Sequence, residues 1–145
     1  SICYESIYGE FMSKYVLNGA NLICIITNDG WWKNTPGHRQ HMNYARLRAI
    51  ETRTWVARSA NTGISCFIDP YGTVINPQPY NTAATIKQAI SSGNPIASGS
   101  KTFFVKQGDL LSKSMVVLSI LLLGWYCTLK ILRRFFKKKF PALQE

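Results

Sequence analysis

The stretch Leu22–Thr27, which reads LICIIT, decides how the N-terminal part of the chain folds. It is an unbroken apolar run of strand length and is rich in β-branched residues. Runs of this kind are typical of central strands that are covered on both faces. We therefore expect a buried strand here, with other layers packed on both of its sides.

The residues before this strand predict the end of another strand followed by a helix. Residues 1–4 read as a strand, and residues 5–16 carry apolar side chains at helical spacing. The expected apolar face contains Ile7, Phe11, Met12, Tyr15 and Val16. Asn18 and Gly19 supply a stop signal for that helix. Cys3 is accordingly expected at a strand-to-helix junction.

The residues after the strand predict a loop, a second helix and three shorter strands. The loop at 28–39 is rich in Asn, Gly and Trp, and the helix at 40–53 has Met42, Ala45 and Ala49 on one side. The strands are expected at 54–60, 64–69 and 73–75, with a Pro-Gly turn at 69–72. Residues 76–107 read as loops with one or two short strands. This order favours an α/β layered fold.

The C-terminal part of the chain contains a long apolar segment. Residues 114–132 are apolar apart from Lys130, which lies near the end of the run. A helix of this length spans roughly 28 Å, close to the hydrocarbon thickness of a bilayer. The alternative is a buried core helix, but the basic residues that follow directly favour a stop-transfer boundary. They are Arg133, Arg134, Lys137, Lys138 and Lys139.

The positive-inside rule then predicts the orientation of this transmembrane helix. Residues 133–145 are expected to form a basic cytoplasmic tail, and residues 1–113 to form a domain in the periplasm or outside the cell. The net charge is +10, and its densest cluster lies next to the apolar run and not on a face with base-stacking aromatic residues, so no nucleic-acid partner is expected. The four cysteines lack the spacing of metal or disulfide motifs and read as free thiols: Cys3, Cys24, Cys66 and Cys127.

Two residues near the start have both a chemical and a structural interpretation. Cys3 at the carboxyl edge of a sheet, beside helix N–H groups, suits an activated thiol, although cysteines are often small buried hydrophobes. Glu5 is either an active-site carboxylate or an acid that favours the start of a helix. The residues alone leave both questions open.

Several other polar and aromatic residues are candidates for binding. His38 and His41 lie three apart but lack a third ligand, so hydrogen bonding or substrate contact is expected and a metal is not. Trp31 and Trp32 suit either a core or a membrane interface. Four arginines are expected to form a solvated or salt-bridged face: Arg46, Arg48, Arg53 and Arg58. Between Arg48 and Glu51 we expect a structural ion pair.

Five ordered motifs carry a resemblance to a known family. They are Ile2-Cys3-Tyr4-Glu5, Asn28-Asp29-Gly30-Trp31-Trp32, Gln40-His41 with 45–51, residues 58–65, and Asp69-Pro70-Tyr71-Gly72. Together they resemble the carbon-nitrogen hydrolase (nitrilase) superfamily. Within it, the chain looks like the acyltransferases whose domain is inserted between membrane helices. The resemblance extends over nearly the whole chain.

The resemblance implies a four-layer α-β-β-α sandwich, of which residues 1–113 are the C-terminal portion, and a Cys-Glu-Lys triad. Cys3 matches the nucleophile and Glu5 the acidic residue that follows it. Substrate contacts are expected from Tyr4, Trp31, Trp32, His38 and His41. The base Glu and the Lys are expected upstream, in a longer protein, so the chain by itself should be inactive. No cofactor is implied.

The implied reaction moves a fatty acyl group from a phospholipid, through a cysteine thioester, to the N-terminal amine of diacylglyceryl-cysteine in apolipoproteins. The implied location is the bacterial inner membrane, with the catalytic domain in the periplasm. One alternative is a membrane-tethered amidase or nitrilase of the same superfamily that gives its acyl-enzyme to water. Another is a non-catalytic, membrane-anchored remnant or binding module.

Overall fold

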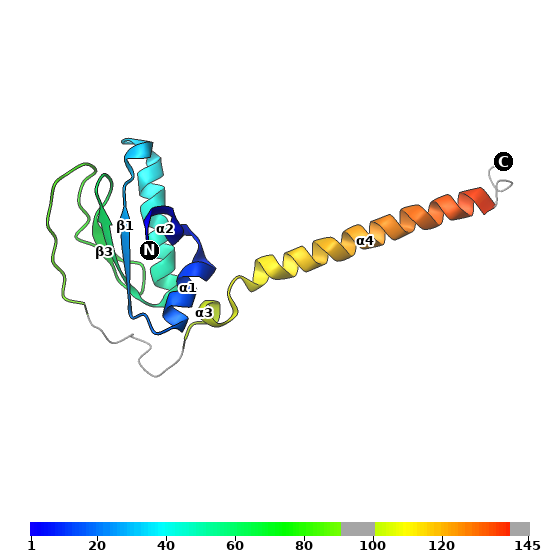
Figure 1. Cartoon of the computed structure of the whole chain (residues 1–145), viewed down its shortest axis with the longest axis horizontal. Helices are drawn as coiled ribbons and strands as arrows, with labels where there is room; N and C mark the ends of the chain where they lie inside the picture. Colours follow the sequence, from blue (N-terminus) through cyan, green and yellow to red (C-terminus); the bar gives the residue numbers. More distant parts are fainter. Residues whose placement is uncertain (91–100, 140–145) are drawn as a thin grey trace. The chain divides into compact units, whose positions relative to one another are not determined.

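The computed structural model describes residues 1–90 and 101–139, which divide into two units, Ser1–Gly108 and a second unit that begins at Asp109. The first unit is a mixed α/β structure, as predicted, and Figure 1 shows its sheet strands beside α1 and α2. Its elements are the 3-10 helices η1 (Cys3–Ile7) and η2 (Gly30–Trp32), the helices α1 (Gly9–Leu17), α2 (Pro36–Thr52) and α3 (Phe103–Gln107), and the strands β1 (Leu22–Thr27), β2 (Trp55–Ala60), β3 (Cys66–Ile68) and β4 (Val74–Ile75).

The sheet has the order β1-β2-β3-β4 and contains both parallel and antiparallel pairs. β1 and β2 are parallel and are connected through α2, whereas β2, β3 and β4 pair antiparallel in sequence order. In this register Ile25 lies opposite Arg58, and Arg58 lies opposite Cys66. The Pro-Gly turn joins β3 to β4 as predicted, with the Gly72 N–H donating to the Asp69 carbonyl oxygen.

The helices α1 and α2 cover one face of this sheet and form the core with it. The core side chains come from both helices, β1, β2, β3 and α3: Met12, Val16, Ile23, Ile25, Ala45, Ala49, Val56, Cys66, Ile68 and Val105. The other face of β1 is exposed in the described residues, with 65% of Ile26 accessible. The prediction that this strand is covered on both faces is therefore wrong for this chain, because burial alternates along β1.

The predicted helix at 5–16 is interrupted, which is a second correction. Tyr8 is extended between η1 and α1, with φ −85° and ψ 98°. Carbonyl groups that a continuous helix would use are taken by side chains, because Ser6 Oγ donates to Cys3 and Arg48 Nη1 donates to Ile7. The expected apolar face is also partly wrong, since Met12 and Val16 enter the core while Phe11 and Tyr15 stay exposed.

The second helix begins earlier than predicted. Thr35 is its N-cap, with its hydroxyl accepting from Gly37 N–H, and Pro36 occupies the first turn. This Thr-Pro pair is a helix-start signal. Ala45 and Ala49, predicted to lie on one side of this helix, are both fully buried. Residues 76–90 form loops, as expected, but residues 103–107 form the helix α3, which the sequence did not predict; 91–100 lie outside the described residues.

The second unit contains α4 (Leu110–Lys139), which extends beyond both ends of the predicted helix at 114–132. Asp109 caps its first turn, because its carboxylate accepts hydrogen bonds from the backbone and hydroxyl of Ser112. An 18-residue window within Leu110–Arg134 has a mean hydropathy of 2.0. By length and composition it is able to cross a membrane.

Candidate active site

Cys3 lies at the carboxyl end of β1, at the junction that the sequence predicted. Ile2 forms a parallel bridge with Ile26, and η1 starts at Cys3 itself. The Cys3 backbone is left-handed, with φ 49°, and its side chain is partly exposed. A non-glycine residue in this region costs about 1–2 kcal/mol. Backbone strain of this kind is common at functional sites, which makes Cys3 a candidate nucleophile.

Two side chains hold the turn that carries Cys3. The Glu5 carboxylate accepts a hydrogen bond from the Ile2 N–H at 2.7 Å, and the Ser6 hydroxyl donates to the Cys3 carbonyl oxygen at 3.0 Å. Glu5 thus fixes the backbone on one side of the cysteine and Ser6 fixes it on the other. In this geometry Glu5 acts as the acid that starts a helical turn.

A hydroxyl group lies next to the thiol. Thr27, the last residue of β1, places Oγ1 at 3.4 Å from Cys3 Sγ and at 3.0 Å from Asp29 Oδ1. Its single hydroxyl hydrogen can be donated to either acceptor. The thiol of Cys3 therefore has a polar neighbour at the end of β1.

Behind the thiol lies a buried cluster of charged groups formed by Asp29, His41 and Arg58. Asp29 is fully buried; its Oδ1 is 2.9 Å from His41 Nδ1, and its Oδ2 accepts from Arg58 Nη2 at 2.6 Å. Burial alone would raise the pKa of Asp29, but the hydrogen bonds from His41 and Arg58 and their charges hold that pKa below its ordinary value. The carboxylate is therefore the anion that the cluster is built around.

The turn between β2 and β3 closes over this cluster. Arg58 Nη1 donates to the Ile64 carbonyl oxygen at 2.5 Å, and Asp29 N–H donates to the Thr62 carbonyl oxygen at 2.6 Å. Gly63 has φ 149°, and a Cβ at this position would lie 2.6 Å from Asp29 Oδ2. Only glycine fits there without a shift of the carboxylate.

The solvated or salt-bridged face expected for the arginines includes two that are salt-bridged. Arg48 and Arg58 are both buried, because each has an acidic partner within the fold. The predicted ion pair between Arg48 and Glu51 is confirmed, with 3.1 Å between Nη2 and Oε1. Burial lowers the pKa of Arg48, and the charge of Glu51 partly offsets that effect. This pair joins α2 to the turn at Ile7 and has no contact with the thiol.

Ser6, His41 and Asp29 have the order of a serine hydrolase triad but not its exposure. Ser6 Oγ lies 3.3 Å from His41 Nε2, while His41 Nδ1 faces Asp29. Only 1% of Ser6 is accessible, and its hydroxyl already donates to the Cys3 carbonyl oxygen. Because this hydroxyl hydrogen is already used to hold the cysteine turn, Ser6 is not arranged as a nucleophile. The chain of contacts instead connects the charged cluster to the backbone of Cys3.

The aromatic residues expected to contact substrate divide into three groups. The rings of Tyr4, Trp32 and His41 pack together, with centroid distances between 5.3 and 6.0 Å. Trp31 is 85% exposed. His38 is buried against Tyr80, with a centroid distance of 4.6 Å. Tyr4 and Trp31 are thus accessible, whereas His41 is buried beneath Tyr4 and Trp32.

Four residues of the site were not among the predicted catalytic or binding residues: Ser6, Thr27, Asp29 and Arg58. Arg58 carried a usable signal, because alternation along β2 places it on the same face as buried Val56. A cation at such a position needs a buried anion, and Asp29 lies two residues after the end of β1. The four cysteines are free, as predicted. Burial raises the pKa of Cys66 to about 11, which leaves it unreactive.

The sequence of this chain is similar to those of a known protein family. The sequence profile of the family described as carbon-nitrogen hydrolase matches residues 1–94. Apolipoprotein N-acyltransferase of Agrobacterium fabrum is 46% identical over 93 residues, which cover 64% of this chain and 17% of that protein. The enzyme of the same name from Thermotoga maritima is 32% identical over 119 residues, covering 82% of this chain and 23% of that protein.

The matched part is thus less than a quarter of the length of these relatives. The profile match covers more than half of the chain and includes the cysteine turn, Asp29, His41 and Arg58. This chain therefore belongs to the carbon-nitrogen hydrolase family.

Proposed function

We propose that the intact protein containing this chain is an N-acyltransferase of lipoprotein maturation, with Cys3 as its nucleophile. The observation that carries the proposal is the Cys3 thiol, which is partly exposed, held in a left-handed turn and placed next to the Thr27 hydroxyl. The relatives named apolipoprotein N-acyltransferase support the choice of reaction within the family.

The proposed reaction has two steps. The Cys3 thiolate attacks an ester carbonyl of a phospholipid, a C–S bond replaces the C–O bond, and the lysophospholipid leaves with a proton. The α-amine of diacylglyceryl-cysteine then attacks the thioester carbonyl, loses a proton and regenerates the thiol. A covalent intermediate lets two lipid-anchored substrates use one site in turn.

The other site residues have supporting roles in this proposal. Glu5 and Ser6 fix the turn, and Thr27 donates to the sulfur. Tyr4, Trp31 and Trp32 contact the acyl chain, since Tyr4 and Trp31 are exposed and Tyr4 packs against Trp32. His41 is a positioning residue because its ring lies beneath Tyr4 and its two nitrogens face Asp29 and Ser6. The base and the oxyanion-stabilising Lys of the family triad belong to other parts of the intact protein.

The proposed location is the bacterial inner membrane. α4 spans it, with the domain that contains Cys3 in the periplasm and the basic residues after 132 in the cytoplasm. The apolar length of α4 supports a membrane location for both substrates.

Mass spectrometry of the intact protein after incubation with phospholipid tests this proposal. We expect one added fatty acyl mass, absent from Cys3→Ala, retained in the matched variant Cys24→Ala, and removed by a diacylated lipopeptide with formation of an amide. An adduct that water removes equally fast would replace the acyltransferase with the hydrolase alternative. No adduct under any condition would favour the non-catalytic alternative.

A further inference from the structure

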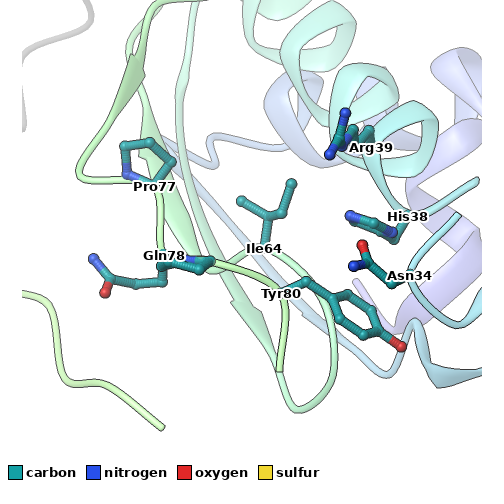
Figure 2. A pocket seen from close by; sticks show the side chains of 8 residues that line it. Asn34, His38, Arg39, Ile64, Pro77, Gln78 and Tyr80 are labelled. Carbon is teal, nitrogen blue, oxygen red and sulfur yellow. The ribbon is translucent and has the colours of Figure 1, made fainter. Parts of the chain in front are cut away.

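A cavity of about 440 Å³ lies beside the first turn of α2, separate from the thiol. Its lining residues are Asn34, His38, Arg39, Ile64, Pro77, Gln78, Pro79 and Tyr80, and none of them is acidic. Figure 2 shows Arg39, His38 and Asn34 on one side and Pro77 and Gln78 on the other, with Ile64 between them. The cavity is thus a cleft between the start of α2 and the segment that follows β4.

His38 is the polar group in this lining that needs a partner. Its side chain is 2% exposed, yet its Nδ1 has no hydrogen-bond partner among the described residues. Tyr80 packs against the His38 ring but does not hydrogen-bond with Nδ1. A buried polar atom left without a partner costs about 1–3 kcal/mol, so a ligand in the cavity that bonds Nδ1 recovers this energy.

The electrostatics of the cavity favour an anion. His38 and Arg39 belong to the first turn of α2, a helix of 17 residues, where the backbone dipole is positive. Arg39 is exposed and has no ion-pair partner within the described part of the chain. A guanidinium fork, an imidazole nitrogen and the Asn34 amide together match the oxygens of a phosphate group.

We propose that this cavity binds a phosphate group, and, as an extension of the proposed function, that the phosphate belongs to the headgroup of the acyl-donor phospholipid. The acceptor, diacylglyceryl-cysteine, has no phosphate, so the cavity distinguishes donor from acceptor. It is connected to the nucleophile through α2: His38 lies one helical turn before His41, whose ring contacts Tyr4, the neighbour of Cys3. The site acts in thioester formation and has no part in transfer to the amine.

The first test measures binding without reaction, in the intact protein with Cys3→Ala. The probes are dioctanoyl phosphatidic acid, dioctanoylglycerol and inorganic phosphate, with calorimetry as the readout. We expect Arg39→Gln and His38→Ala to weaken phosphatidic acid binding about tenfold or more, as for loss of a charge-assisted hydrogen bond. Dioctanoylglycerol binding should not change. Arg46→Gln, an exposed arginine of the same helix, is the matched control.

Inorganic phosphate separates the two sources of the group. Competition by millimolar phosphate, weakened by the same variants, supports the phosphate site, and tighter binding of phosphatidic acid assigns it to a lipid headgroup. Equal affinity for inorganic phosphate and phosphatidic acid would overturn the headgroup assignment. Phosphatidic acid binding that is unchanged in both Arg39→Gln and His38→Ala would overturn the site itself.

The second test uses turnover and separates this proposal from the proposed function. With Cys3 present, Arg39→Gln should slow acylation of the thiol by phospholipid but not by a p-nitrophenyl ester, which lacks phosphate. Equal slowing with both donors would overturn the headgroup role. Absence of acylation by either donor in the unmodified protein would contradict the proposed function, while the binding result would still decide the phosphate site.

Discussion

At the scale of single residues, the question for His41 is whether its side chain contacts the substrate or positions the turn that carries Cys3. Its ring is buried, and it connects Asp29 to Ser6, whose hydroxyl holds the Cys3 carbonyl group. His41→Ala removes this connection and lets the thiol shift. A misplacement of about 1 Å can cost roughly 10²-fold in rate, so thioester formation should slow by this order.

The kinetic pattern separates the two roles of His41. We expect kcat to fall with little change in KM for the phospholipid, and His41→Asn to recover part of the rate, because an amide can still donate to Asp29. Phe11→Ala, at an exposed position of α1, serves as the control. A rise in KM with unchanged kcat would instead establish the substrate contact that the sequence suggested.

The ion pair between Asp29 and Arg58 makes a prediction about stability and pH. Because the pKa of Asp29 is lowered in the folded protein, its charged form stabilises the fold above pH 4, and this contribution is lost as the pH falls below about 4. Asp29→Asn leaves Arg58 buried without an anion and should cost about 3–5 kcal/mol at pH 7. Denaturant unfolding followed by tryptophan fluorescence measures both effects.

Two comparisons check this assignment. The loss of unfolding free energy between pH 5 and pH 3 should be smaller in Asp29→Asn than in the unmodified protein. Arg46→Ala, which removes an exposed arginine, should change the unfolding free energy by less than about 1 kcal/mol. Equal pH dependence with and without Asp29 would show that other carboxylates control acid unfolding.

At the scale of elements, the contact between α2 and η2 depends on a glycine. A Cβ on Gly37 would lie 2.6 Å from Trp32 Cδ1, so Gly37→Ala must displace the indole that packs on His41. Alanine favours the helix itself by up to about 1 kcal/mol, so α2 should persist while Trp32 moves. We expect altered tryptophan fluorescence and slower acylation, with normal helicity by circular dichroism.

A glycine without neighbours provides the control for Gly37. Gly124 in α4 has open space around its Cα, so Gly124→Ala should change neither fluorescence nor acylation. The Trp31→Phe background removes the signal of the adjacent exposed indole. Unchanged fluorescence of Gly37→Ala in that background would contradict the packing of Trp32 against α2.

Elements with a clear local pattern were predictable from the sequence, whereas long-range contacts were not. The bounds of β1 and the buried positions Ala45 and Ala49 follow from periodicity and agree with the structure. The break at Tyr8 does not, because it depends on Arg48, which is 41 residues from Ile7. In the site, the cysteine turn was predictable from its motif. The contacts of Asp29 were not, because its partners His41 and Arg58 lie 12 and 29 residues away in the sequence.

At the scale of the whole molecule, the exposed face of the sheet agrees with the limited length of the chain. The side chains of Leu22, Cys24 and Ile26 lie on this face of β1 and are exposed in the described residues. In the four-layer fold implied by the family resemblance, a second sheet packs on this face. The described residues contain one sheet and its helical layer, and the matched relatives are more than four times as long as the part they share with this chain.

The charges on either side of α4 predict its orientation in the membrane. Before the apolar run stands Lys113, and directly after it stand five cations, Arg133, Arg134, Lys137, Lys138 and Lys139. Each basic residue near an anionic membrane surface contributes about 1 kcal/mol. This difference favours retention of the C-terminal flank in the cytoplasm. A fluorescent protein fused after Glu145 of the intact protein should fluoresce, and alkaline phosphatase at the same position should be inactive.

The reciprocal fusion tests the orientation independently of the C-terminal tail. In this test the intact protein is truncated after Gly108, before α4 begins, and fused to alkaline phosphatase. The phosphatase should be active, because position 108 precedes the span and is expected in the periplasm. The same truncation fused to the fluorescent protein should be dark. If both reporters indicate the same side of the membrane for positions 108 and 145, α4 does not cross the membrane, and its apolar surface must be covered by protein instead. Opposite sides with the phosphatase active at 145 would invert the topology and place Cys3 in the cytoplasm.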